Sequence, residues 1–461
     1  MKMSISIQAS AVQRVHDVTL PAIEEIMAIS GTPSLAFAIC HQGEPLKTFH
    51  LGFRDIEHKL KSNDQTRFNI NSMTKGMVSA LTGIEVSKET VDWCKSIKDA
   101  LSNFSSTDAV AEDNATVIDM LSHRSGITNF DAYWLRSENS VLLARDQTLN
   151  CFSTLEKCLP FRASFNYNNW GYELVVEVLE KRAGRSMSAL LHDRLFEPLA
   201  MSRTSTTWHP ENDNQAKSYA VLDDITTVEI PPPKLETAGS IFKECRNIVT
   251  NHAHFPGPSI REQGYGAGFA RSQLLGQMGR ISLNPLIGEE PIVGKEGQSR
   301  LVVYHHGSMP GTPLDTADFV GQCLLETVLN VPKPNDYPSL TSQFAQRGLS
   351  HNDIIKAELE AQRKPGTQPR MLSTYVGRYW NTVYNVSIHV TEHFDQLKIC
   401  FQSSNSEIYD LEHYEDDMFS WLLMYNQAMS RGRYVTDFKA SYYLMSVDIT
   451  ESHDMNTLRW A

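Results

Sequence analysis

The sequence predicts an α+β fold. A main domain over residues 1–363 would have an antiparallel sheet flanked by helices, and a small antiparallel, β-barrel-like domain would follow over residues 371–461. Apolar runs of strand length lie on both sides of a long, mostly helical middle section. Residues 364–370 (KPGTQPR) have the composition of a linker. After them the chain consists of short runs in which apolar and polar residues alternate, as in antiparallel β domains.

The first half of the main domain begins with a predicted helix and hairpin. Residues 8–29 place apolar side chains at helical spacing, and residues 34–39 (SLAFAI) have the pattern of a buried strand. A turn at 41–44 leads to a returning strand at 46–53. Further helices are expected from Ser72 onwards, and at 117–121 and 171–183.

In the second half of the main domain, strands are expected first and helices after them. Three consecutive prolines at 231–233 mark a loop, and strands are expected at 265–271 and 300–305. Helices are expected at 316–329 and 350–363. Beyond the linker, 386–390 and 397–401 are typical strands of the small β domain.

The composition excludes several classes of partner. Asp and Glu outnumber Lys and Arg by 54 to 42, for a net charge of −12, so nucleic acid and anionic membranes are not expected partners. No apolar run is long enough for a membrane span, and the first residues lack the apolar core of a signal peptide. The seven cysteines are scattered without a Cys-x-x-Cys pair, and His252 and His254 have no carboxylate set nearby. We therefore expect a cytoplasmic, reduced protein with no metal site.

Ser72-Met73-Thr74-Lys75 opens a helix-prone stretch. Positions i and i+3 share a helix face, so the Ser72 hydroxyl and the Lys75 amine are expected to meet one turn apart. A serine is activated by an adjacent base, and a lysine is such a base only where burial or a neighbouring charge lowers its pKa from about 10.4. Free N–H groups in the first helical turn would stabilise an oxyanion. The spacing indicates acyl transfer without a Ser-His-Asp triad.

The alternative is that Ser72 only caps a helix and that Lys75 is solvated. Ser240 and Lys243 have the same spacing, so chance matches occur in this chain. Ser72 is preferred because a good helix and further motifs follow it. An α/β-hydrolase is disfavoured because the sequence has no Gly-x-Ser-x-Gly elbow.

Further motifs follow in a recognisable order. They are residues 72–75 (SMTK), 121–126 (LSHRSG), 167–172 (YNNWGY), 195–201 (LFEPLAM) and the third motif, 305–311 (HHGSMPG). Together they resemble the superfamily of serine β-lactamases, penicillin-binding proteins and D-aminopeptidases, in its class C-like esterase branch. Residues 375–380 (YVGRYW) resemble the start of the small β-barrel domain that many members append. The resemblance implies a β-lactamase/transpeptidase-like serine hydrolase domain.

The resemblance implies that Ser72 attacks an ester, thioester or amide carbonyl of a small-molecule or peptide acyl substrate. Lys75 and Tyr167 would share the work of general base. A lone tyrosine is more often part of a core, so this assignment of Tyr167 depends on the motif around it. His123 is expected to brace a helix turn rather than to react. No cofactor is implied, and the oligomeric state is not indicated.

The remaining site residues also follow from the resemblance. Asn169 would orient Lys75 or the acyl amide of the substrate. His305 would replace the family's third-motif lysine as a donor, and Gly307 belongs to the same motif. The backbone N–H groups of the nucleophile and of Ser308 would form the oxyanion hole. A histidine in this motif favours an esterase or D-aminopeptidase over a lactam hydrolase, with an acyltransferase of secondary metabolism as an alternative.

The chain departs from the family pattern after the third motif. Family members usually continue into one or two apolar strands, whereas residues 309–318 lead almost directly into a predicted helix. The region from 237 to 269 is also short. A missing strand would leave unpaired backbone groups at a sheet edge. A shortened, catalytically weak member that acts through binding is therefore a second hypothesis.

Overall fold

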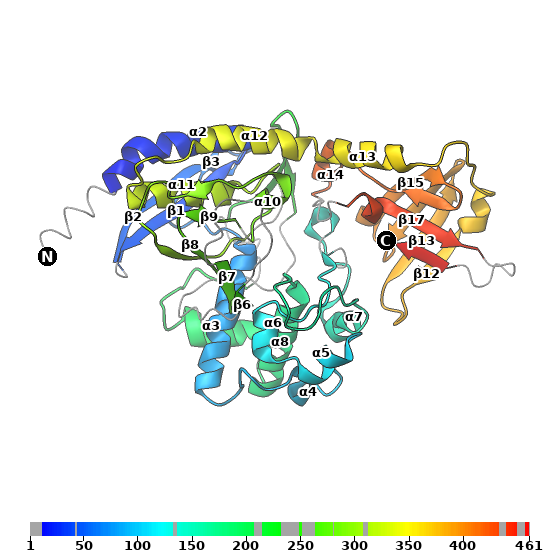
Figure 1. The fold of residues 1–461 in the computed structure, drawn as a ribbon, viewed down its shortest axis with the longest axis horizontal. Helices are drawn as coiled ribbons and strands as arrows, with labels where there is room; N and C mark the ends of the chain where they lie inside the picture. The colour runs from blue at the N-terminus through cyan, green and yellow to red at the C-terminus, as the bar shows by residue number, and fades with distance from the viewer. Residues whose placement is uncertain are drawn as a thin grey trace, which may run out of the picture.

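The computed structural model describes residues 12–41, 44–131, 136–206, 214–231, 249–250, 263–279, 281–307, 312–432, 439–449 and 457–460. Within these ranges helices and antiparallel sheets form the main part of the molecule, and a separate antiparallel sheet lies at the C-terminal end (Figure 1). The predicted α+β class is therefore confirmed.

A helix and a three-stranded sheet form the N-terminal part. The elements are η1 (Val15–Thr19), α2 (Leu20–Ser30), β1 (Ser34–His41), β2 (Glu44–Asp55) and β3 (Leu60–Lys61). They agree with the predicted helix and hairpin. Helices α11 (Thr316–Leu329) and α12 (Tyr337–Leu349) share a buried cluster with α2, which includes Ile23, Phe319 and Phe344. Partly buried residues of β1 and β2 pack against this cluster.

A helical lobe follows. Its elements are η2 (Asn71–Met73), α3 (Thr74–Ser87), α4 (Ile97–Ala100), α5 (Ala109–Asn114), α6 (Val117–Leu121), η4 (Ser137–Asn139), η5 (Arg145–Gln147), α7 (Thr148–Phe152), α8 (Asn169–Ala183), α9 (Met187–Leu191) and η6 (His192–Phe196). The predicted helices at 117–121 and 171–183 correspond to α6 and α8. Helices α3 and α8 share the largest buried cluster, with Met77, Leu81 and Leu174 among its members.

A second sheet has the order β11-β8-β7-β6. Its strands are β6 (Val249–Thr250), β7 (Gln263–Gly266), β8 (Phe269–Gln273) and β11 (Leu301–Tyr304). The single strand expected over 265–271 is wrong, because the chain reverses at Ala267-Gly268. Gly268 has φ +78°, and a Cβ there would stand 2.8 Å from the carbonyl oxygen of Lys75. The tight turn thus packs directly on the helix that carries Lys75.

Smaller elements complete the main part: the pair β4 (Ser218–Val221) and β5 (Thr227–Ile230), the pair β9 (Gly276–Gln277) and β10 (Ile292–Val293), and α10 (Asn284–Ile287). In the described part of the chain, β1 pairs with β2 alone and β11 with β8 alone. Leu301 and Val303 on β11 are 50% and 40% exposed. Residues 312–315 contain no strand before α11 begins. Residues 308–311 lie outside the described residues, so the expected direct passage into this helix stays a prediction.

A buried polar cluster joins α11 to the third motif. Asp318 Oδ1 lies 3.1 Å from His306 Nε2. The Gln322 amide donates hydrogen bonds of 3.0 Å to Asp318 Oδ1 and to Glu290 Oε2. Burial, and then the charge of Asp318, raises the pKa of Glu290 to about 9. Burial acts to raise the pKa of Asp318 as well, but His306 and the hydrogen bonds outweigh burial and lower it.

The C-terminal sheet is a seven-stranded meander in which each strand pairs antiparallel with the next. Its elements are η7 (Leu372–Tyr375), β12 (Gly377–Trp380), β13 (Ser387–His393), β14 (Gln396–Phe401), η8 (Asn405–Glu407), β15 (Ile408–Glu415), β16 (Met418–Ser420), α14 (Tyr425–Ser430), η9 (Ala440–Tyr443), β17 (Leu444–Asp448) and β18 (Thr457–Trp460). It curls into a nearly closed barrel, which we call the barrel (Figure 1).

Helices α2, α12 and α13 (His351–Gln362) form a row along one edge of the molecule that ends beside the barrel (Figure 1). The helix expected at 350–363 corresponds to α13, and the strands expected at 386–390 and 397–401 correspond to β13 and β14. Helix α12 was not identified from the sequence. Residues 364–370 contain no helix or strand.

Because the carboxyl of Glu290 is buried, we expect the folded protein to lose stability at alkaline pH. Its pKa is raised on folding from an ordinary value of 4.5, so its contribution to stability is present below that value and is lost as the pH rises towards about 9. Glu290→Gln mimics the protonated carboxyl. We expect the variant to match the wild type at pH 5 and to melt at a higher temperature at pH 8 to 9, as measured by thermal unfolding. Exposed Glu289→Gln is the control, and equal pH dependence in Glu290→Gln and the wild type would contradict the expectation.

Candidate active site

Ser72 and Lys75 lie at the centre of the site. Ser72 belongs to η2, which continues directly into α3, and Asn71 before it has φ +47°. Asparagine tolerates this left-handed conformation better than most residues, so it allows a sharp entry into the helix. The Lys75 amine donates a hydrogen bond of 3.1 Å to Ser72 Oγ, and Lys75 is 8% exposed. The structure therefore brings together the two groups that the spacing predicted to meet.

Aromatic rings enclose the Lys75 amine. Its Nζ lies 4.9 Å from the ring centroid of Tyr167 and 5.3 Å from that of Tyr172. The Tyr172 hydroxyl donates to the carbonyl oxygen of Leu121 at 2.7 Å, and burial raises the pKa of this phenol. Both rings therefore present a face to the Lys75 amine. Because its hydroxyl is engaged with Leu121, Tyr172 forms a wall of the site.

His123 packs against the motif at residues 167–172 (YNNWGY). Its ring stacks on Tyr167 with centroids 4.4 Å apart, and its Nδ1 accepts a hydrogen bond of 3.0 Å from the backbone N–H of Asn168. Burial, and then the charge of Lys75, lowers the pKa of His123 well below its ordinary value. A neutral His123 therefore braces the loop that carries Tyr167.

Asn168 and Asn169 have different partners. Asn168 caps α8, because its Oδ1 accepts from the N–H of Gly171 at 3.0 Å. The Asn169 amide donates a hydrogen bond of 2.9 Å to Asp131 Oδ1. The Asn169 amide is therefore held by Asp131, and it is not hydrogen-bonded to Lys75, the residue it was expected to orient.

The third motif closes the site on the other side. His305 Nδ1 faces the carbonyl oxygen of His306, which can only accept, so Nδ1 carries the proton and Nε2 accepts from the Tyr265 hydroxyl at 3.1 Å. Burial, and then the charge of Lys75, lowers the pKa of His305 to about 3. His305 is therefore neutral, and both of its ring nitrogens are engaged with Tyr265 and His306. Its expected role as a donor to Tyr167 or to a substrate carboxylate stays a prediction.

Gly307 lies against the turn that carries Ser72. A Cβ at this position would stand 2.1 Å from the carbonyl oxygen of Ile70 and 3.2 Å from the nitrogen of Met73. Only glycine allows this approach. Ser308, the other expected oxyanion residue, lies outside the described residues.

The sequence did not identify Tyr265 or Asp131 as members of the site. Tyr265 is completely buried and touches His123 as well as His305. Its position at the start of Tyr265-Gly-Ala-Gly-Phe269 was a signal of close backbone packing. Asp131 carried no local signal.

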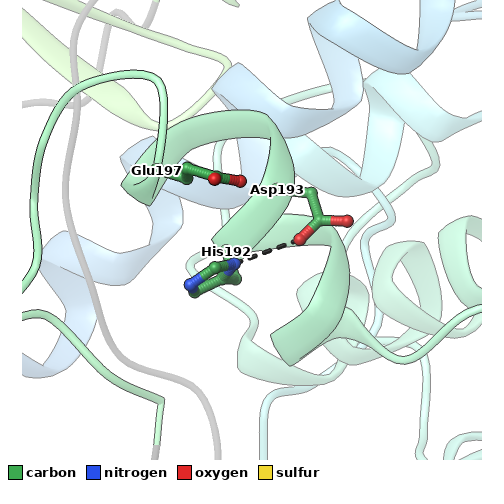
Figure 2. Close-up of side chains that lie close together, drawn as sticks. All are labelled: His192, Asp193 and Glu197. Atoms are coloured by element: carbon green, nitrogen blue, oxygen red, sulfur yellow. Dashed lines mark hydrogen bonds and ion pairs between the residues drawn. The ribbon is translucent and has the colours of Figure 1, made fainter.

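One side-chain cluster has the spacing of a metal site. Among the residues that the structure describes, His192, Asp193 and Glu197 place ligand atoms within 4.8 Å of one another (Figure 2). Asp193 is already paired with Arg185 at 2.6 Å, and His192 and Glu197 are exposed. We assign no metal to this surface group. In the described ranges, no helix has both the length and the apolar character needed to cross a membrane.

Two family profiles match this chain. The profile of the Beta-lactamase family matches residues 21–273, and that of a domain of unknown function, DUF3471, matches residues 361–456. The chain is 23% identical over 209 residues to Gigasin-6 of Magallana gigas, which covers 43% of this chain and 66% of that protein. It is 25% identical over 291 residues to a D-aminopeptidase of Brucella ovis, which covers 62% of this chain and 47% of that protein. The chain thus spans less than two thirds of either curated relative.

A solved structure has the same fold over nearly the whole chain. It is an octameric penicillin-binding protein homologue from Pyrococcus abyssi, with a TM-score of 0.50 and 17% identity, and the match covers 95% of this chain and 98% of that one. At this identity the likeness concerns the fold alone. Because the family profile covers more than half of the chain and the fold agrees with it, the protein belongs to the Beta-lactamase family.

Proposed function

We propose that this protein is a serine acyl-enzyme hydrolase that acts on an ester, thioester or amide. The observation that carries the proposal is the 3.1 Å contact between Lys75 Nζ and Ser72 Oγ in an aromatic, buried setting. A base within hydrogen-bond distance is what a serine needs to become a nucleophile. The D-aminopeptidase relative supports the same class of chemistry.

In the proposed reaction, the Lys75 ammonium first releases a proton to water. Ser72 Oγ then attacks the carbonyl carbon and passes its proton to the neutral amine. The Tyr167 ring lies against the same amine, and in the proposal its hydroxyl shares the general-base work with Lys75, as one unit, once substrate is bound. The leaving group departs with this proton, and an ester between Ser72 and the acyl group remains. Water then attacks that ester, its proton is taken by the same unit, and the acid is released.

The third motif forms the opposite wall of the proposed site. The close approach of Gly307 to Ile70 supports a fixed position for the turn that carries Ser72. In the proposal, the Ser72 N–H in this turn is one of the oxyanion donors. Neutral His305 contributes no positive charge for a substrate carboxylate. This supports an esterase or aminopeptidase rather than a lactam hydrolase.

Ser72→Ala is expected to abolish labelling by a fluorophosphonate and turnover of p-nitrophenyl acetate, because no other serine has Lys75 as its partner in the proposal. Intact-mass spectrometry and absorbance assays measure the two effects. Ser87→Ala, an exposed position at the other end of α3, is the matched control. A well-folded wild type that is never labelled would favour the shortened, binding-only member instead.

Lys75→Met removes the proton acceptor and keeps a long apolar stem. We expect kcat for p-nitrophenyl acetate to fall by about 10²- to 10⁴-fold, the usual contribution of a general base. The fold should persist, since the change takes a polar group out of an aromatic pocket. Near-wild-type turnover in the variant would exclude Lys75 as the base.

Gly307→Ala places a methyl group where the carbonyl oxygen of Ile70 lies. The turn that carries Ser72 must move, so we expect both labelling and turnover to fall. Gly321→Ala on α11 is the control, because a Cβ there meets nothing within 4 Å. If the two variants had equal turnover, the close approach would be irrelevant to catalysis.

A further inference from the structure

One stretch of chain touches both the candidate active site and the interior of the barrel. We call residues 129–131 and 136–139 the bridging segment; residues 132–135 between them lie outside the described ranges. Its first part lies against the start of α8, and its second part lies against barrel residues. The two ends therefore connect regions that are distant in the sequence.

The first end fixes the start of α8. Asp131 Oδ1 accepts from the Asn169 amide at 2.9 Å, and the carbonyl oxygen of Asn129 accepts from the Trp170 indole at 2.6 Å. The Asn129 amide in turn donates to Asp131 Oδ2 at 3.1 Å. The position of Asn169 therefore depends on where residues 129–131 are held.

The second end lies inside the barrel. Arg136 and Glu407 both have fully buried side chains, and Arg136 Nη1 lies 3.5 Å from Glu407 Oε2. The guanidinium carbon of Arg136 lies 4.1 Å from the ring centroid of Phe401 and 5.3 Å from that of Trp460. A buried arginine is tolerated only beside a partner, so this pair determines how deeply the segment enters the barrel.

Further contacts hold this end in register. The Ser137 N–H donates to Glu407 Oε1 at 2.7 Å, and the Ser137 hydroxyl lies 2.9 Å from that of Tyr409. The Glu138 N–H donates to the carbonyl oxygen of Arg431 at 2.6 Å. Two of these bonds, those of the Ser137 and Glu138 N–H groups, use the backbone of the segment, so residues 137 and 138 cannot shift without breaking them.

Phe130 connects the two ends. Its ring centroid lies 5.1 Å from that of Trp460 on β18. It packs against the buried cluster of the helical lobe and also against that of the barrel. It stands next to Asp131, so a displacement of the barrel is transmitted to the residue that holds Asn169.

We infer that the barrel is a positioning element for the active site. Through Arg136, Glu407 and Phe130 it fixes the bridging segment. Through Asp131 the segment fixes Asn169, which lies two residues after Tyr167 at the start of α8. Asp131 and Glu407 are positioning residues, because neither touches the reacting atoms. The inference rests on the proposed function only in giving Tyr167, which precedes α8, a part in the reaction.

The rival explanation is that the barrel only adds stability. A stability role changes the fraction of folded molecules but not the behaviour of each folded site. Fluorophosphonate titration counts competent sites, so turnover per titrated site separates the two. Hydrogen–deuterium exchange of the peptide over residues 165–172 reports on the same link without any activity.

Glu407→Gln keeps the shape of the side chain and removes the charge that faces Arg136. Exposed Glu412→Gln on β15 is the matched control. We expect Glu407→Gln to speed exchange over 165–172 and to lower turnover per titrated site by about 10- to 100-fold, as small misplacements in active sites do. Glu412→Gln should change neither. A lower melting temperature with wild-type exchange and turnover per site would overturn the inference.

Two further variants keep the test decisive. Phe130→Ala removes the contact of the bridging segment with Trp460 and leaves no unpaired charge inside the barrel. It therefore replaces Glu407→Gln if that variant does not fold. Asp131→Ala cuts the link at the active-site end. Since the links act in series, Asp131→Ala combined with either barrel-side variant should lose no more turnover than the worse single variant. Losses that multiply would contradict the inference. A wild type without labelling would refute the proposed function alone, and the exchange data would still decide this inference.

Discussion

The site is organised around one buried amine, that of Lys75. Burying a lysine is costly unless its surroundings accept it, and here a serine oxygen and aromatic faces do so. The same amine, together with burial, keeps the pKa of His123 and of His305 low. Both histidines are therefore neutral supports rather than competing bases. In the proposed reaction, proton transfer at Ser72 is thus left to Lys75 and to Tyr167, whose ring lies against it.

The wall that faces Ser72 is held in an unusual way. A strand in a complete sheet is fixed on both sides by backbone hydrogen bonds, which do not depend on the side chains present. Within the described residues, β11 has such bonds on one side only. Just beyond the end of β11, the chain is held by the His306–Asp318 pair and by the contact of Gly307 with the Ser72 turn. Because these are side-chain and close-packing interactions, this wall depends on the identity of a few residues.

Local patterns predicted the parts of the structure that depend on local contacts. The Ser72–Lys75 meeting follows from helical spacing, and α11 and the barrel strands follow from periodicity. The reversal at Gly268 was missed because a period-two pattern continues through a two-residue turn. The partnership of Tyr265 with His305, and of Asp131 with Asn169, joins residues that are far apart in the sequence or lack a motif. Such pairings are determined by packing, on which a single sequence gives no information.

The same limit applies to the relation between the two parts of the molecule. A change in composition after residue 363 indicates a second unit, but it does not indicate that an arginine from the helical lobe would be buried inside that unit. A charge in such a position is stable only when its partner is in place, so the lobe segment and the barrel must become ordered together. Phe130 contributes to both hydrophobic clusters at once. The helical lobe and the barrel thus share part of their hydrophobic packing, and neither completes it without the other.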